Sequence, residues 1–337
     1  MAGRKKITKK TVIQITAMGL TVIAFIAAVI AVTKIISNKR ELPEVEPSGI
    51  PTKKAQTYYH DGKEYVLKKN VETFLILGID DRETMGQTGK YINQSQADVL
   101  FLFVLDNDNK TYQTLQLNRD TMTIVHTVSA DGKDTGDATM QLALAHAYGR
   151  NDEDRCKNTV DAVSALLFDA DIDHYVSLTM DAIPILNEKV GGVTVTIPED
   201  MTVVDPAFVK GATVTLQGDQ AEKFVRAREE LPNDTNIFRM ERQRIFLEDW
   251  RSKVESRINA STGFALDMLL SLSDYLVSDM TVFEMADFAS TLAEYQDLGM
   301  LTTEGTVTDG ELFKEYNVDM DNLEDKVIQM LYTEAEQ

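Results

Sequence analysis

Two apolar stretches separated by a polar turn occupy the middle of the chain. Residues 99–105 are a continuous run of Val, Leu and Phe, which is typical of a strand buried on both faces. Residues 106–110 contain only Asp, Asn and Lys, and Asp and Asn favour tight turns. Residues 111–117 then alternate Leu115 and Leu117 with polar positions, as a returning strand does. The pattern therefore predicts an antiparallel hairpin centred on residue 108.

Charged residues occupy the open end of this predicted hairpin. Asp98 stands at the start of the first strand, and Arg119 and Asp120 follow the second, so antiparallel pairing brings them to one edge of the sheet. Residues 73–79 form another apolar strand that ends at Asp80. If this strand also pairs antiparallel, Asp80 meets Asp98 at the same edge. The alternative interpretation is a set of polar strand ends that face water.

Helical and strand patterns alternate through the rest of the chain. Short strands are predicted at residues 174–178 and 193–197. Helices are predicted at residues 138–148, 156–167, 181–189, 216–224 and 239–258. Apolar helical stretches at residues 264–276, 282–292 and 323–331 carry no candidate chemistry and are interpreted as scaffold.

The predicted helix at residues 239–258 has one apolar ridge with a spacing of four. The ridge consists of Phe246, Trp250, Val254 and Ile258. Extending the ridge backwards reaches Arg242 and Arg239, so both arginines point inward at the positive end of the helix dipole. Buried cations need partners, and a bound anion supplies one. Salt bridges to Asp234 or Glu241 are the alternative.

Two further arginines, Arg226 and Arg228, follow the predicted helix at residues 216–224. Their side chains project to the same face if this segment is extended, and they diverge if it is helical. Their contribution to an anion site therefore depends on the local backbone.

The chain of 337 residues carries a net charge of −20 that is distributed unevenly. Residues 1–69 hold thirteen Lys/Arg and five Asp/Glu, a net of +8, which leaves −28 for residues 70–337. A domain this acidic lacks the basic surface that nucleic-acid binding requires. A single cysteine excludes an intrachain disulfide, and four scattered histidines argue against a zinc site.

The basic residues cluster in front of an apolar segment. Residues 1–10 form a basic tail, and residues 11–36 contain about twenty mostly apolar residues, which is enough to span a bilayer as a helix. The positive-inside rule places the tail in the cytoplasm and the remaining chain outside the cell. A cleaved signal peptide is the competing interpretation, but the apolar run is longer than a signal core, which favours an uncleaved single-pass anchor.

A linker follows the predicted membrane helix. Residues 37–69 combine prolines with charged residues, which is typical of an extracellular stalk. The remaining residues, 70–335, fit one large domain.

Eight short motifs follow one another through residues 70–335. They are LGIDDR, ADVL, NRDT, AHAYG, IDHYV, VGGVTVTIP, LQGDQAEKFVRAR and ND…RMERQR. In this order they resemble the extracytoplasmic catalytic domain of the LytR–CpsA–Psr family of Gram-positive bacteria. The resemblance implies an α/β/α layered domain with a mixed central sheet, preceded by one N-terminal transmembrane helix.

The resemblance also implies an activity. Members of the family bind a polyprenyl pyrophosphate lipid in an apolar tunnel. They transfer a phosphate-linked glycopolymer, such as teichoic acid or capsule polysaccharide, from that lipid to peptidoglycan with the help of Mg²⁺. A membrane-anchored extracellular phosphotransferase is therefore expected. The alternatives are a non-catalytic scaffold that binds lipid pyrophosphate or glycan, and a regulator of the cell envelope.

Site residues are carried over from the family by motif position. Asp80 and Asp98 match the metal-binding aspartates, and Arg119 with Asp120 matches the catalytic pair. The residues expected to bind pyrophosphate are Arg82, Arg119, Arg226, Arg228, Arg239, Arg242 and Gln243. Bidentate guanidinium contacts suit phosphate oxygens. Ala97 and Asn118 depart from the family, which usually has serine and proline at these positions.

Overall fold

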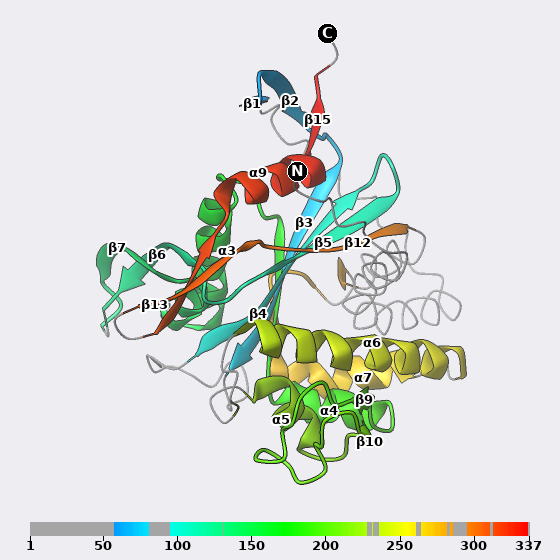
Figure 1. Cartoon of the computed structure of the whole chain (residues 1–337). Coiled ribbons are helices and arrows are strands. Elements are labelled where there is room, and N and C mark those ends of the chain that lie inside the picture. Colours follow the sequence, from blue (N-terminus) through cyan, green and yellow to red (C-terminus); the bar gives the residue numbers. More distant parts are fainter. Residues whose placement is uncertain are drawn as a thin grey trace, which may run out of the picture.

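A mixed six-stranded sheet forms the centre of the protein (Figure 1). The computed structural model describes residues 57–80, 95–129, 131–227, 231, 236–260, 264–281, 284–285, 295–310 and 313–335. The strand order is β11-β8-β3-β4-β5-β12. The bounds are β3 Val71–Asp80, β4 Gln96–Asp106, β5 Thr111–Leu117, β8 His174–Thr179, β11 Leu276–Ser278 and β12 Gln296–Thr302.

The pairing within this sheet confirms the predicted hairpin. Strands β4 and β5 are antiparallel, with Asp106 opposite Thr111, and β3 pairs antiparallel with β4. Strand β8 pairs in parallel with β3, and β12 pairs in parallel with β5. Strand β11 pairs antiparallel with β8 at the edge of the sheet. The predicted mixed α/β architecture is therefore confirmed.

Helices cover both faces of the sheet (Figure 1). One face carries α4 (Ala182–Lys189), α5 (Gln220–Arg226), α6 (Asn236–Ala260) and α7 (Phe264–Leu272). The other carries α3 (Asp152–Leu166), α9 (Met320–Leu331) and the 3₁₀ helix η1 (Leu142–Ala147). Side chains of a strand alternate between these layers: Phe74 and Ile76 of β3 enter the first core, and Leu75 and Leu77 enter the second.

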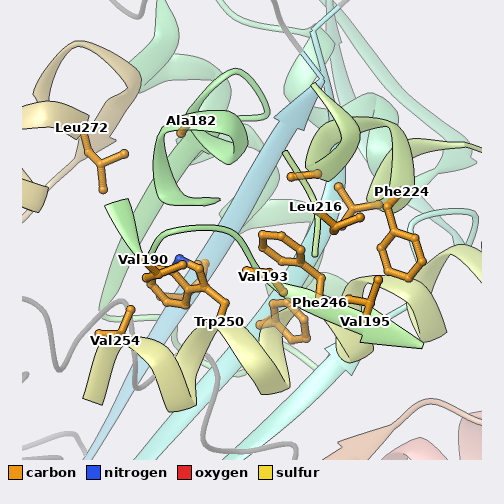
Figure 2. Packing of buried hydrophobic residues seen from close by; sticks show 14 of the residues in the cluster. Ala182, Val190, Val193, Val195, Leu216, Phe224, Phe246, Trp250, Val254 and Leu272 are labelled. Carbon is orange, nitrogen blue, oxygen red and sulfur yellow. The ribbon is translucent and has the colours of Figure 1, made fainter. Parts of the chain in front are cut away.

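The first core is built around α6 (Figure 2). Phe246, Trp250 and Val254 are buried on its inner face, which confirms the predicted ridge; the side chain of Ile258 lies outside the described part. The indole Nε1 of Trp250 donates a hydrogen bond to the Leu186 carbonyl at 2.8 Å. This bond satisfies the only polar atom of a large buried side chain and fixes α6 against α4.

In the described part of the chain, four small sheets lie outside the central one, and strands β6 (Met122–Val128) and β7 (Asp134–Gln141) form one of them. Strands β9 (Thr194–Thr196) and β10 (Thr213–Thr215) pair beneath α6, and β13 (Gly305–Asp309) pairs with β14 (Lys314–Val318). Strands β1 (Thr57–His60) and β2 (Lys63–Leu67) form a hairpin that pairs with β15 (Tyr332–Glu334). Residues 57–67 were predicted as linker, but they are part of the folded domain because this hairpin completes a sheet with the C-terminal strand.

The predicted helix at residues 138–148 is wrong in its first half. Residues 138–141 belong to strand β7 (Asp134–Gln141), which pairs antiparallel with β6 (Met122–Val128). Only η1 that follows is helical. Tertiary pairing with β6 supplies the backbone hydrogen bonds, so it overrides the apolar spacing that suggested a helix.

Two further predictions differ from the structure or fall outside it. The predicted helix at residues 264–276 ends at Leu272, and a 3₁₀ turn η2 (Ser273–Tyr275) leads into β11. Most of the predicted helix at residues 282–292 lies outside the described residues. So do residues 1–56, which contain the predicted membrane helix. Within the described ranges, no helix is both long and apolar enough to cross a membrane.

Candidate functional site

A β-bulge places Asp98 at the centre of the candidate site. In the β3–β4 pair, Gly78 lies opposite Val99 and Ile79 lies opposite Ala97, so Asp98 is the extra residue between them. A bulge breaks the regular alternation of side chains and re-aims one of them. Asp98 is only 5% exposed, and its carboxylate points toward β5 and α6 rather than into water.

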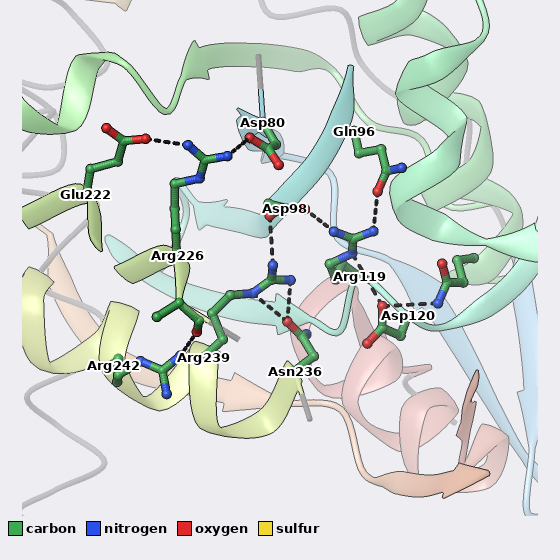
Figure 3. A network of polar contacts seen from close by, with 12 residues as sticks. Asp80, Gln96, Asp98, Arg119, Asp120, Glu222, Arg226, Asn236, Arg239 and Arg242 are labelled. Atoms are coloured by element: carbon green, nitrogen blue, oxygen red, sulfur yellow. Dashed lines mark hydrogen bonds and ion pairs between the residues drawn. The ribbon is translucent and has the colours of Figure 1, made fainter. Parts of the chain in front are cut away.

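The Asp98 carboxylate binds two arginines at once (Figure 3). The Arg119 guanidinium donates to Oδ1, and Nη1 of Arg239 donates to Oδ2 at 2.8 Å. Arg119 also donates to the side-chain oxygen of Gln96. Both guanidinium groups are buried, so the carboxylate neutralises part of a positive charge that has little access to solvent.

A second carboxylate–arginine pair lies beside the first. Arg226, the last residue of α5, donates to Asp80 at the end of β3 and to Glu222 within its own helix. Burial raises the pKa of Asp80, and the nearby negative charge of Asp98 raises it further. The effect of Asp98 on this pKa agrees with the prediction that the two aspartates share one edge of the sheet.

The segment 118–121 is held in place from both sides. Backbone amides of η1 donate to the carbonyls of Arg119 and Thr121 at 2.9 and 2.8 Å. The side chain of Gln141 donates to the Asp120 carboxylate at 3.2 Å, and Nε of Arg119 lies 3.3 Å from the same oxygen. Asp120 therefore orients Arg119.

Asn118 connects this segment to the first turn of α6. Its side-chain oxygen accepts hydrogen bonds from Nδ2 of Asn236 at 2.8 Å and from the Asp120 amide at 3.0 Å. The oxygen of Asn236 accepts in turn from Nε and Nη2 of Arg239, at 3.0 and 2.6 Å. A proline at position 118 has no side-chain oxygen, so this departure from the family adds a bridge between β5 and α6.

Arg242 points inward as predicted, but its contacts differ from those of Arg239. Its guanidinium donates to the Phe224 carbonyl at 3.0 Å, to Glu199 at 2.7 Å and to the Ala227 carbonyl. It is 1% exposed, and it links α6 to the end of α5. The alternative acid Glu241 pairs with Arg244 instead, and Asp234 lies outside the described residues.

A narrow apolar cavity of about 130 Å³ opens beside the ion pairs. It lies between the sheet and helices α4 and α6, and its lining includes Gly78, Val99, Val225, Gln243 and Trp250. Gly78 and Val99 are close in sequence to Asp80 and Asp98, and Val225 and Gln243 directly adjoin Arg226 and Arg242. The cavity therefore borders the charged network. The amide of Gln243 is buried, and neither its nitrogen nor its oxygen has a hydrogen-bond partner among the described residues. A polar ligand group at this border would satisfy it.

The AHAYG motif supports the start of β4. His146 is completely buried, and its Nδ1 lies 3.0 Å from the hydroxyl of Ser95. Burial lowers the pKa of His146 to about 4, so the imidazole is neutral at pH 7. Ser95 directly precedes Gln96, and the motif thereby anchors the strand that carries Asp98.

The structure brings most of the predicted site residues together. Asp80, Asp98, Arg119, Arg226 and Arg239 form the network, and Asp120 flanks it (Figure 3). Arg82 and Arg228 lie outside the described residues. The missing serine at position 97 is explained locally, because Ala97 is fully buried in the second core.

Sequence reasoning missed Gln96, Asn236 and Glu199 as partners of these arginines. Gln96 lies two residues before Asp98, but the bulge at Asp98 interrupts the strand alternation that would relate the two side chains, so the sequence carries no signal for this contact. Asn236 lies three residues before Arg239, the spacing of helix neighbours. Glu199 carries no local signal, since it is 43 residues from Arg242.

The chemistry of the network suits a phosphate anion with a divalent cation. No group of three or more His, Cys, Asp or Glu that could hold a metal occurs among the described residues. Mg²⁺ does not need one, because one or two carboxylates and the substrate phosphates complete its shell. Asp80 and Asp98 therefore fit such an ion, and the arginines fit the anion.

The fold and site define an α/β/α protein with a network of paired arginines and carboxylates at the border of an apolar cavity. The chain matches the LytR_cpsA_psr family over residues 33–334, and it belongs to that family.

Two named relatives in Bacillus share part of the sequence. The chain is 28% identical over 237 residues to a "Polyisoprenyl-teichoic acid--peptidoglycan teichoic acid transferase TagU" of Bacillus cereus (strain AH820), which covers 70% of this chain and 69% of that protein. It is 31% identical over 170 residues to a transferase of the same description, TagV, of Bacillus subtilis (strain 168). The second match covers 49% of this chain and only 39% of TagV, well under two thirds of its length.

Solved structures share the fold. The protein gbs0355 of Streptococcus agalactiae aligns with a TM-score of 0.60 at 18% identity, over 77% of this chain and 87% of that one. A structure described as "TagT bound to LI-WTA" aligns with a TM-score of 0.55 at 21% identity, over 78% of this chain and 91% of that one.

The contacts of Arg242 predict a structural contribution without any ligand. Replacing it (Arg242→Gln) leaves two buried carbonyls and Glu199 without their donor, so unfolding free energy should fall by about 3 kcal/mol. Urea denaturation measures this. Arg150→Gln is the control: Arg150 is 74% exposed, so solvent screens its pair with Asp154 and the substitution should leave the unfolding free energy nearly unchanged. An equally stable Arg242→Gln variant would contradict the assignment.

Proposed function

We propose that the protein is a membrane-anchored extracellular phosphotransferase that moves a phosphate-linked glycopolymer from a polyprenyl pyrophosphate lipid to peptidoglycan. The observation that carries this proposal is the position of buried arginines and an unsatisfied Gln243 at the border of an apolar cavity. The apolar lining of the cavity suits a hydrocarbon chain, and the arginines suit a pyrophosphate. Family membership and the similarity to the teichoic acid transferases TagU and TagV support the same substrate class.

The arginines stabilise the charge that moves during the reaction. An acceptor hydroxyl attacks the phosphorus that carries the glycopolymer, the bond to the bridging oxygen breaks, and the lipid monophosphate leaves with the electron pair. Arg119, Arg226 and Arg239 are placed to neutralise the phosphate oxygens, and such preorganised donors lower the barrier. The acceptor's proton passes to Asp120, whose carboxylate flanks Arg119.

We assign the metal site to Asp80 and Asp98. When bound there, Mg²⁺ supplies positive charge to the pyrophosphate oxygens. Both carboxylates contact arginines in the structure. A bound pyrophosphate would replace the carboxylates as partner of the arginines and leave Asp80 and Asp98 free to bind the ion. We therefore expect Mg²⁺ to bind well only together with pyrophosphate.

The basic N-terminal tail and the apolar residues 11–36 support a single-pass anchor with the domain outside the cell. That side of the membrane is where a peptidoglycan acceptor would be. A non-catalytic lipid-binding scaffold uses the same arginines and stands as the alternative, with a regulatory role as a further one.

Turnover separates these alternatives. Full-length protein in detergent, mixed with a glycan linked to a short polyprenyl pyrophosphate and with peptidoglycan, should release lipid monophosphate. Arg119→Ala should slow this release on the order of 10²–10³-fold, because it removes a positioned donor. Arg150→Ala, far more exposed, should react at the wild-type rate. If the protein bound the lipid but released no lipid monophosphate, it would be a scaffold. If it did not bind the lipid at all, the regulatory role would be the remaining alternative.

The metal assignment is tested without turnover. Adding Mg²⁺ to protein with inorganic pyrophosphate should tighten binding about tenfold, and this gain of about 1.4 kcal/mol should raise Tm by roughly 2–4 °C. In Asp80→Asn, Mg²⁺ should no longer raise the Tm of the protein with pyrophosphate. Glu222→Gln is the matched control, since Glu222 is the other carboxylate on Arg226 but lies on α5 away from the strand end. If Mg²⁺ raised the Tm of Asp80→Asn as much as that of the wild type, Asp80 would not be a metal ligand.

Topology has its own test. Protease added to intact protoplasts should digest the chain beyond residue 40 and leave an N-terminal epitope tag protected, because the basic tail is retained in the cytoplasm. A tag on the C-terminus should be lost at the same protease concentration. Protection of the C-terminal tag would exclude an extracellular domain.

A further inference from the structure

A second, polar pocket borders the network at the end away from the apolar cavity. Its lining includes Asn118, Asp120, Asn236, Val307, Lys314 and Tyr316. Its volume of about 10 Å³ has room for one water-sized group, such as a hydroxyl. None of these residues lines the apolar cavity.

The β13–β14 hairpin forms the outer wall of this pocket. The Tyr316 amide donates to the Asp120 carbonyl at 2.9 Å, and Nε2 of Gln141 donates to the Lys314 carbonyl at 2.7 Å. The hydroxyl of Tyr316 donates to the Thr303 carbonyl at 2.9 Å, which fixes the ring. The hairpin is thereby held against the segment that carries Arg119 and Asp120.

The two openings lie on different sides of the arginines. Figure 3 shows Asp80 and Arg226 on one side, Asp120 on the other, and Asp98 between them. The apolar cavity borders the Asp80 side through Gly78 and Val225. Displacement at phosphorus requires the attacking and leaving oxygens to lie roughly in line on opposite sides. A lipid leaving group in the cavity therefore places the attacking group at the polar pocket.

The charges of the pocket select against a second phosphate. Asp120 and Glu315 carry negative charge, and Lys314 alone is positive among its lining residues. The amides of Asn118 and Asn236 add neutral donors and acceptors. This composition suits a neutral group with several hydroxyls.

We propose that this acceptor pocket binds the sugar hydroxyl of a peptidoglycan glycan strand and that the β13–β14 hairpin sets the enzyme's acceptor specificity. The proposal rests on the proposed transferase function. The hydroxyl oxygen forms the new bond to phosphorus, the bond to the bridging oxygen breaks, and the lipid monophosphate leaves with its electrons. The hydroxyl proton moves to the carboxylate of Asp120 at the inner end of the pocket.

Filling the pocket tests the proposal. Val307 is 38% exposed on β13, so Val307→Trp adds bulk at the pocket without disturbing the core. Thr308→Trp is the matched control, because the next residue of a strand faces the opposite side and does not line the pocket. Each full-length variant is assayed with a glycan on a short polyprenyl pyrophosphate and soluble peptidoglycan strands. Melting with inorganic pyrophosphate reports folding and the donor site.

Val307→Trp should lower kcat/KM for the peptidoglycan acceptor at least tenfold while pyrophosphate still raises its Tm as in wild type. Thr308→Trp should match wild type in both measurements. Lys314→Met provides a second readout, with a higher KM for the acceptor and a nearly unchanged kcat, since the Lys314 carbonyl contact to Gln141 is kept. Wild-type acceptor kinetics in both pocket variants would overturn the proposal. Absence of transfer by the wild type would instead refute the proposed function.

Discussion

The buried carboxylate of Asp98, bonded to Arg119 and Arg239, is the interaction on which the site depends. Removing a carboxylate and two guanidinium groups from water costs several kcal/mol for each ion, and only mutual contact and further hydrogen bonds offset that cost. The contact joins the start of β4, the end of β5 and the first turn of α6. It also keeps both arginines in position when no anion is bound, so the donors are preorganised for a ligand.

The fold uses this charged junction to separate two kinds of environment. On one side, α4, α5 and α6 leave an apolar cavity against the sheet, bordered by Gln243. On the other side, the end of β5 and the β13–β14 hairpin leave a polar pocket. An amphiphilic substrate with a charged centre matches this order of apolar cavity, arginines and polar pocket. The segments that carry the arginines also form the walls of these compartments: α5 lines the apolar cavity, the end of β5 lines the polar pocket, and α6 lines both.

Arg239 and Arg242 show how far helical periodicity can be interpreted. Both were predicted to point inward, and both are buried. Their partners nevertheless differ, because Arg239 contacts Asp98 whereas Arg242 contacts Glu199 and two carbonyls at the end of α5. Periodicity fixes the direction of a side chain on its own helix. It contains no information about which distant segment lies opposite.

The sequence by itself determined the central hairpin, the antiparallel strand beside it and the apolar ridge of α6, because these depend on local alternation and spacing. It placed Asp80 and Asp98 at one edge only on the condition that their strands pair antiparallel, and the structure shows that pairing. Only the tertiary structure decided that a bulge turns Asp98 inward, that residues 138–141 form a strand and that residues 57–67 join β15. Each of these depends on contacts between residues far apart in the chain, where pairing and burial outweigh local preference.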